Sequence, residues 1–326
     1  MKKRLEIING RCVIPEGVKV IEPGAFCDCT SLKSVTIPGS VEHIGSQAFC
    51  WCYGLEEVTI PDGVKVIESG AFCDCISLKS VTIPGSVERI GSQAFSWCYG
   101  LEEVTISNGV SGIERDAFYG CKRLTSVSIP SSVRSIHPAA FAACPRLESI
   151  VVDEGNPVFK SVSNCCLTKD GRTLVFGCKT SVIPAGVGHI SDYAFMRSFA
   201  LRSLEIPEGV ESIGYWAFFE CASLTSVSIP SSLKEIDETA FAGCPLKRIR
   251  LCSPDPDGCA GLEESLCSRK LGKVTLYVPN EALGAYGKHP FFKQFKSIIG
   301  FKYESNGKIR HWRPGLAHQR QPGREE

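Results

Sequence analysis

A spacing of 23 residues runs through most of this 326-residue chain. The pair Ala-Phe recurs nine times on this spacing, with one break, and an isoleucine stands five residues before each phenylalanine. A unit this short cannot bury its own apolar face, so units of this kind stack and bury it between neighbours. The phenylalanines of the column are Phe26, Phe49, Phe72, Phe95, Phe118, Phe141, Phe195, Phe218 and Phe241.

Each repeat also contains a stretch that alternates between apolar and polar residues. In "LKSVTIP" the valine and isoleucine share one side, Ser34 and Thr36 share the other, and Pro38 ends the strand because it has no amide hydrogen. A second short extended piece and a helical turn at the phenylalanine complete the repeat. We therefore expect a right-handed solenoid with a parallel β-sheet face, short second strands and helical turns.

Cysteine stands three residues after the phenylalanine in eight of the nine repeats. A metal site needs three or four ligands that converge on one point, whereas this column is a line with one thiol every ~4.8 Å. A free cysteine behaves as a small buried hydrophobe. We interpret the column as a structural ladder and expect neither a metal ion nor a cofactor. Its members are Cys29, Cys52, Cys75, Cys98, Cys121, Cys144, Cys221 and Cys244.

A second cysteine column directly follows the phenylalanine in only three repeats, at Cys27, Cys50 and Cys73. Later repeats carry Ser96 and Tyr119 there, which predicts a partly exposed position. The rung spacing falls within the range of disulfide Cα separations, so the sequence leaves both the thiol and the disulfide form open.

Composition and motifs exclude several classes of function. The 36 basic and 35 acidic residues give a net charge of +1, so we expect no nucleic-acid partner. No run approaches the length of a membrane span, and the opening MKKR is not followed by the apolar run of an export signal. The six histidines show no metal-binding or nucleophile-activating spacing, so we expect no enzyme and no catalytic residues.

The full pattern is Ile-Pro, Val, two residues, Ile, three residues, Ala-Phe, two residues, Cys and Leu. It resembles the BspA-like leucine-rich repeats of bacterial and protist surface proteins. The resemblance implies a monomeric, non-catalytic binding protein, secreted or at the cell surface, that serves adhesion or recognises a protein or glycan ligand. Because the chain shows no export signal, the cytoplasm stays open, and an intracellular structural or interaction scaffold is the alternative.

The phase of the repeats and the resemblance together predict four parts and one insertion. The insertion breaks the phase, and its hairpin is expected to turn at Asp170-Gly171. A module that closes the array is expected at the end, because an open strand edge invites aggregation. The predicted divisions are an N-terminal cap segment 1–13, leucine-rich repeats 14–252 with a hairpin insertion 156–180, a C-terminal capping module 253–301 and a flexible tail 302–326.

The outward positions of the main strands form a candidate binding face. Most are small hydroxyl residues, which are also good strand formers, so a merely solvated face is the competing interpretation. Residues 14–59 and 60–105 differ at only five of 46 positions, and copying such a unit lengthens a binding surface and raises avidity. The candidate face consists of Ser34, Thr36, Glu57, Thr59, Ser80, Thr82, Glu103, Thr105, Ser126 and Ser128.

Overall fold

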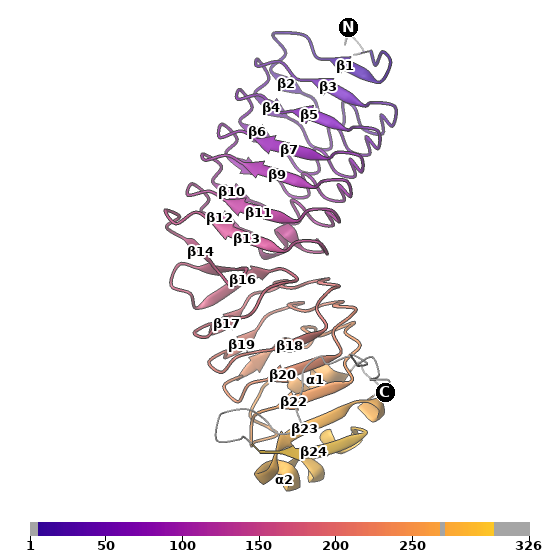
Figure 1. The fold of residues 1–326 in the computed structure, drawn as a ribbon. Helices are drawn as coiled ribbons and strands as arrows, with labels where there is room; N and C mark the ends of the chain where they lie inside the picture. The colour runs from indigo at the N-terminus through magenta and orange to yellow at the C-terminus, as the bar shows by residue number, and fades with distance from the viewer. Residues whose placement is uncertain (1–5, 268–270, 303–326) are drawn as a thin grey trace, which may run out of the picture.

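The chain forms an elongated stack of short turns. The computed structural model describes residues 6–267 and 271–302, and these build a parallel β-solenoid of about 12 turns of ~23 residues. Figure 1 shows the turns following one another from β1 to β24, each beside the next. The predicted solenoid is thereby confirmed.

One side of the stack carries the longer strands. Before the insertion they lie in sequence order and run parallel, so that Val35 stands beside Val58 and Thr36 beside Thr59 in neighbouring rungs. Their bounds are β1 (Arg11–Val13), β3 (Ser34–Thr36), β5 (Glu57–Thr59), β7 (Ser80–Ile83), β9 (Glu103–Ile106), β11 (Ser126–Ile129) and β13 (Ser149–Val152). The inward residue of every rung is buried, as the alternation predicts.

A second, parallel sheet of two-residue strands forms another side of each turn. Its isoleucines point into the core, and the residue before each of them lies at or near the surface except at Gly112, which is buried. The bounds are β2 (Val20–Ile21), β4 (His43–Ile44), β6 (Val66–Ile67), β8 (Arg89–Ile90), β10 (Gly112–Ile113) and β12 (Ser135–Ile136). These are the short second strands that the sequence predicts.

The segment around each phenylalanine is a tight turn, and only one is regular enough to count as a helix, the 3-10 helix η1 (Pro138–Phe141). In the first turn the Cys29 amide donates to the Phe26 carbonyl, and the Phe26 amide donates to Ala48 of the next rung. Two columns flank this turn in left-handed backbone conformation, two residues before and two after the phenylalanine. Bulky residues such as Trp51 and Trp97 adopt it at a cost of about 1–2 kcal/mol each.

The phenylalanine column forms a continuous stack inside the solenoid. From Phe26 to Phe141 successive ring centroids lie 5.0 to 5.4 Å apart and the planes differ by 2° to 6°. After the insertion the stack resumes from Phe195 through Phe218 to Phe241. The spacing is slightly larger than the rung spacing of about 4.8 Å, so each ring packs on the ring of the rung before it.

The insertion is a three-stranded antiparallel meander of β14 (Phe159–Val162), β15 (Cys165–Thr168) and β16 (Thr173–Gly177). The predicted hairpin turn at Asp170-Gly171 joins β15 to β16 and is confirmed. Buried Asn156 anchors the start of the meander. Its side-chain amide donates to the Pro130 and Val133 carbonyls at 2.9 and 3.0 Å, and its carbonyl accepts from two following backbone amides.

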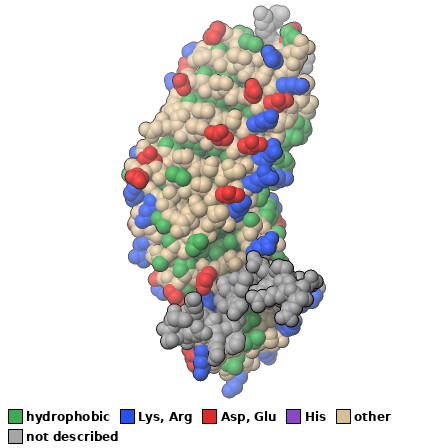
Figure 2. All heavy atoms as spheres, viewed as in Figure 1, with side chains coloured by type: hydrophobic (Ala, Val, Ile, Leu, Met, Phe, Trp, Pro, Cys, Tyr) green, Lys and Arg blue, Asp and Glu red, His purple; other side chains and the backbone are tan. Residues whose placement is uncertain are grey.

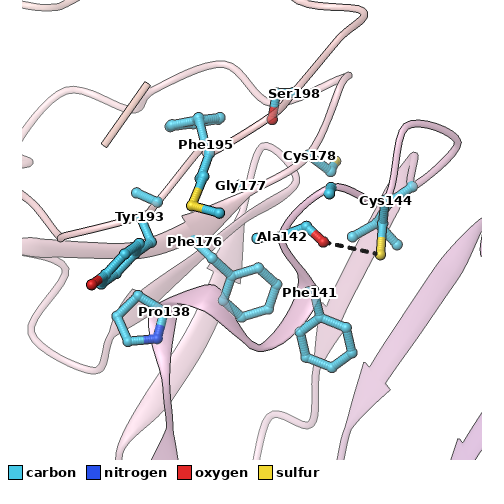
Figure 3. Close-up of a pocket in the computed structure, with 14 residues that line it drawn as sticks. Pro138, Phe141, Ala142, Cys144, Phe176, Gly177, Cys178, Tyr193, Phe195 and Ser198 are labelled. Atoms are coloured by element: carbon cyan, nitrogen blue, oxygen red, sulfur yellow. Dashed lines mark hydrogen bonds between the residues drawn. The ribbon is translucent and has the colours of Figure 1, made fainter. Parts of the chain in front are cut away.

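The meander separates two hydrophobic cores and contributes to both. Cys166 and Phe176 belong to the N-terminal core, whereas Cys165 and Leu167 belong to the C-terminal core. Phe176 stacks on Phe141 at 5.2 Å and so extends the phenylalanine column (Figure 3). The repeat period does not reveal this residue.

After Phe176 the phenylalanine stack is interrupted by the backbone of β16 at Gly177. A Cβ on Gly177 would lie 2.2 Å from the Phe195 ring, so only glycine allows that ring to approach β16. The residues around this junction enclose a cavity of about 10 Å³ (Figure 3), about the space of one water molecule. The two halves of the core are therefore packed against each other with almost no gap.

After the insertion both sheets resume and the array is closed. The strands are β17 (His189–Ile190), β19 (Ser212–Ile213) and β21 (Glu235–Ile236) on one side, and β18 (Ser203–Glu205), β20 (Ser226–Ile229), β22 (Arg248–Leu251), β23 (Thr275–Pro279) and β24 (Ser297–Phe301) on the other. The helical elements are α1 (Leu262–Cys267), η2 (Leu271–Lys273), η3 (Asn280–Ala282), α2 (Leu283–Lys288) and η4 (Phe292–Gln294). Tyr286, Phe292 and Phe295 are buried against the last rungs, with Ile298 packed beside them.

Strands of the solenoid extend into both predicted end segments. Strand β1 falls within the segment 1–13 and pairs with β3, so that segment supplies a rung strand. Strands β23 and β24 continue the sheet into the segment 253–301. Residues 1–5 and, apart from Lys302, the tail 302–326 lie outside the described residues. The boundaries themselves stay predictions.

Candidate functional site

The ten residues of the candidate binding face lie on the outward side of five successive strands, β3, β5, β7, β9 and β11. Register pairs Ser34 with Glu57 and Ser80 with Glu103, so one column alternates serine and glutamate. The second column carries a threonine or serine hydroxyl on every rung, as at Thr36 and Thr59. Nine of the ten residues are exposed and Ser34 is half-buried.

Within residues 6–267 and 271–302 none of the ten makes a side-chain hydrogen bond or an ion pair. The strand ladder satisfies the backbone groups, so the hydroxyls and the two carboxylates can hydrogen-bond only to water or to a ligand. The face therefore presents a flat, regular array of free polar groups.

Several charged residues beside the second sheet are paired with one another. Lys19 and Lys65 reach Glu42 from the rungs on either side, at 2.8 and 3.4 Å, and these contacts lower the pKa of Glu42. Figure 2 shows acidic and basic side chains interspersed over the face in view, most of which is backbone and uncharged polar groups. No single-sign field covers that face.

The cysteine ladder has a defined hydrogen-bond role. The Cys52 thiol donates to the Phe26 carbonyl of the preceding turn at 3.1 Å, and burial raises the pKa of Cys52 to about 12. A buried thiol with a raised pKa is a poor metal ligand and a poor nucleophile at neutral pH. The same contact, at 3.0 to 3.4 Å, is made by Cys52, Cys75, Cys98, Cys121, Cys144, Cys221 and Cys244.

Cys29 and the second cysteine column differ from this pattern. Cys29 opens the ladder on the first rung and is half-buried against the core. In the second column Cys27 and Cys73 are partly exposed, but Cys50 is buried and burial raises its pKa to about 11. Ser96, Tyr119, Ala142 and Met196 of that column are buried too, whereas Phe219 and Ala242 are half-buried, so the prediction of a partly exposed position is wrong for Cys50 and for these four rungs. Side chains of neighbouring rungs cover them, which a single repeat cannot reveal.

The structure brings together one group that the sequence does not indicate. The His289 Nε2 atom lies 3.1 Å from Asp257 and 3.5 Å from Glu263, and the three residues come from a loop, α1 and the end of α2. The Phe291 amide donates to His289 Nδ1, which places the hydrogen of the neutral ring on Nε2, facing Asp257. The contacts of this histidine with the two carboxylates tie the capping elements together.

One histidine contacts a hydroxyl in the geometry of a catalytic pair. His189 Nδ1 lies 2.7 Å from Ser212 Oγ on the next rung of the two-residue strands. Among the described residues no carboxylate orients the other ring nitrogen, which a serine-histidine triad requires. The contact is one more rung-to-rung pair.

Sequence reasoning also missed an aromatic cluster on the turn face. Tyr119, Ala139, Ala142, Ala143 and Met196 form a small buried cluster outside the main cores, with Trp97, Tyr193, Trp216 and Phe219 packed against it. Arg197 crosses the junction to hydrogen-bond the Tyr119 hydroxyl and also contacts Glu220 at 2.7 Å. The sequence signal for aromatic residues on the turn face is the "WCYG" that occurs at residues 51–54 and again at 97–100.

A coil of short parallel strands with leucine, isoleucine and phenylalanine columns defines a leucine-rich repeat solenoid. The family profile described as "BspA type Leucine rich repeat region" matches residues 10–96, 65–170 and 178–298 in six copies. The chain belongs to this family, which confirms the resemblance read from its motifs. No curated protein matches the chain.

Solved structures of leucine-rich repeat proteins have the same fold as this chain. A leucine rich cell surface protein of Faecalibacterium prausnitzii is 31% identical with a TM-score of 0.67, and the match covers 89% of this chain and 78% of that one. The pneumococcal vaccine antigen PcpA is 21% identical with a TM-score of 0.62, over 89% and 88% of the two chains. A leucine-rich repeat protein of Eubacterium ventriosum is 17% identical with a TM-score of 0.57, over 90% and 81%. The last two show the fold alone. In the described part of this chain no helix combines the length and apolarity of a membrane span.

Proposed function

We propose that this protein is a non-catalytic recognition module that binds a protein or glycan ligand on the strand face of β3 to β11. The observation that carries the proposal is the array of ten outward side chains that make no hydrogen bond or ion pair with any other part of the chain that the structure describes, on strands that lie in sequence order. A rigid array of this kind binds without a large ordering cost. We also propose display at the cell surface and a role in adhesion, supported by the cell surface protein to which the chain is similar.

Repetition supports binding rather than catalysis. Each 46-residue unit repeats the same strand-face residues, so a ligand with its own repeats would engage several rungs at once and gain avidity. A catalytic centre gains nothing from such copying, because one set of reacting groups suffices.

The test begins with a screen of the full chain against extracellular matrix proteins and glycans at micromolar concentration. A ligand found there is then measured against the variant Thr59→Arg/Thr82→Arg, which places two long cations on the face. We expect at least a tenfold loss of affinity, and no change in Lys65→Ala, a control on the second sheet. A ligand that binds both variants equally, or the absence of any ligand, contradicts the proposal.

A deletion of residues 60–105 provides a second test. The deletion joins residue 59 to residue 106 without changing the 23-residue phase of the repeats. The shortened solenoid can therefore stack as before, with two rungs fewer in the binding face. Affinity for a repetitive ligand should fall while the melting profile stays cooperative. Fractionation of native cells tests the location separately, and a cytosolic protein would overturn the surface assignment without affecting the binding data.

A further inference from the structure

Two exposed aromatic residues stand out on the turn face, away from the strand face. The Trp51 side chain is 47% exposed and Tyr53 is 42% exposed. Trp51 also holds a left-handed backbone conformation with φ 61°, which is unfavourable for a bulky residue. Trp97 in the second copy has the same φ, so the backbone conformation belongs to the column, and it is the exposure of Trp51 and Tyr53 that calls for an explanation.

The duplicated unit shows what is different about this pair. Trp97 and Tyr99 are the counterparts of Trp51 and Tyr53, 46 residues later. The Trp97 ring contacts Tyr119 edge-on at 4.8 Å and lies over Gly120, where a Cβ would be 2.8 Å from the indole. The second copy is therefore covered by its own chain.

The first copy has different residues in the covering positions. Cys73, Asp74 and Ile76 stand where the second copy has Tyr119, Gly120 and Lys122. Lys122 Nζ lies 3.7 Å from the centre of the Tyr99 ring, whereas Ile76 offers no charge to Tyr53. Trp51 and Tyr53 of the first copy are therefore exposed to solvent. Asp74 supplies a carboxylate at the position where the second copy has Gly120.

The turn segments on which this pair lies carry charge of one sign, whereas Lys79 and Arg123 line a hollow on the far side of Ile76. Asp28 and Asp74 occupy the same column as Trp51, one rung before it and one rung after it. Segments 22–30, 45–53 and 68–76, which form this part of the turn face, contain four acidic residues and no lysine or arginine. A ligand that fits here must bring positive charge.

The same face shows how its aromatic rings are satisfied elsewhere. Lys122 caps Tyr99, Arg115 lies over Tyr193 at 5.5 Å, and Arg197 lies over Tyr119 at 5.9 Å. Within residues 6–267 and 271–302 no cation lies over Trp51 or Tyr53. Tryptophan is the best aromatic partner for a cation, and flanking carboxylates add to the attraction.

We propose that Trp51 and Tyr53, with Asp28 and Asp74, bind a lysine or arginine side chain on an exposed segment of a partner protein. The cation would lie over the aromatic faces, in the role that Lys122 plays in the second copy, and the two carboxylates would hold it from the neighbouring rungs. Ile76 would contact the apolar stem of the same side chain. This site does not depend on the strand face.

The experiment measures binding of an oligolysine peptide to the full chain by calorimetry, with the fully acetylated peptide and a neutral oligosaccharide as comparisons. We expect the charged peptide alone to bind, with an affinity that falls as salt rises. Trp51→Leu should lower the affinity about tenfold, which corresponds to about 1.4 kcal/mol. Asp28→Asn/Asp74→Asn should lower both the affinity and its salt dependence.

Two further variants make the result specific. Ile76→Lys gives the first copy the cation of the second, so it should fill the site from within and weaken peptide binding. Phe199→Leu, at an exposed aromatic residue that stands four positions after Phe195 as Tyr53 does after Phe49, should leave peptide binding unchanged. Melting temperatures close to that of the parent protein show that each variant is folded.

Three results would overturn the proposal. They are equal binding of charged and acetylated peptides, unchanged affinity in Trp51→Leu, and binding of the neutral oligosaccharide in place of the charged peptide. Unchanged affinity in Trp51→Leu would show that the peptide is attracted to the carboxylates alone. Binding of the neutral oligosaccharide would show that the aromatic pair binds a glycan.

Discussion

The phenylalanine column allows a stability prediction in which position along the solenoid is the variable. Phe72 is fully buried and has a stacked neighbour on each side, with ring centroids at 5.0 and 5.2 Å. Truncating a buried phenylalanine to alanine costs about 3–5 kcal/mol. Each aromatic pair adds about 0.5–1.5 kcal/mol beyond the buried area. We therefore expect Phe72→Ala to lower the free energy of unfolding by about 5 kcal/mol.

Phe26 is the matched comparison because it occupies the same place in the first rung. It has one stacked neighbour, Phe49 at 5.0 Å, and its other side borders an open hollow of about 1090 Å³ lined by Ile14 and Ile21. Loss of one pair instead of two, next to a space that water can enter, predicts a cost of about 3 kcal/mol for Phe26→Ala.

The assay is urea unfolding followed by far-ultraviolet circular dichroism and by tryptophan fluorescence. Agreement of the two signals establishes whether each variant unfolds in one step, as the comparison of free energies requires. Phe72→Leu keeps most of the volume and should recover more than half of the loss. If Phe26→Ala proves as costly as Phe72→Ala, stacking between rungs is not what stabilises the column.

Other predictions follow from single sites. Asn156→Ala leaves the Val158 and Phe159 backbone amides without their partner and removes one donor each from the Pro130 and Val133 carbonyls, so it should cost about 3 kcal/mol or more in thermal or urea unfolding, and Asn156→Asp should not restore the loss. Tyr119→Phe, which removes the hydroxyl that Arg197 contacts, should cost about 1 kcal/mol in the same assay. Burial lowers the pKa of His137 below its ordinary value near 6.5; stability should be complete above that value and decrease as pH falls from it, and His137→Asn should flatten this dependence. With pKa values raised to about 11 and 12, Cys50 and Cys52 should resist alkylation at neutral pH until urea unfolds the chain, as mass spectrometry can follow.

The architecture could be predicted from the sequence because each inner column depends only on its own period. A phenylalanine every 23 residues has to meet the phenylalanine of the next turn, and a strand that alternates must place Ser34 and Thr36 outside. Phe176 lies outside that period. Its place in the stack depends on the register of β15 with β16, which shifts between Cys166 and Leu167. No local pattern encodes that shift.

The same limit applies to contacts made between turns or between distant elements. Burial of Cys50 depends on the rungs on either side, and the contact of His289 with Asp257 and Glu263 depends on how three capping elements pack. Such sites need coordinates, because the residues that meet share neither a period nor a segment.

The duplicated unit shows where this fold permits change. Of the five differences between residues 14–59 and 60–105, four lie at exposed or half-buried positions. The fifth, Cys50 to Ser96, exchanges two small side chains at a buried one. One exposed change, Thr30 to Ile76, lies in the same column as Tyr53, and the residues that follow the second copy are those that cover Trp97. Because inner columns must match on every rung, a new function can arise only on the outside, where the two copies have already become different.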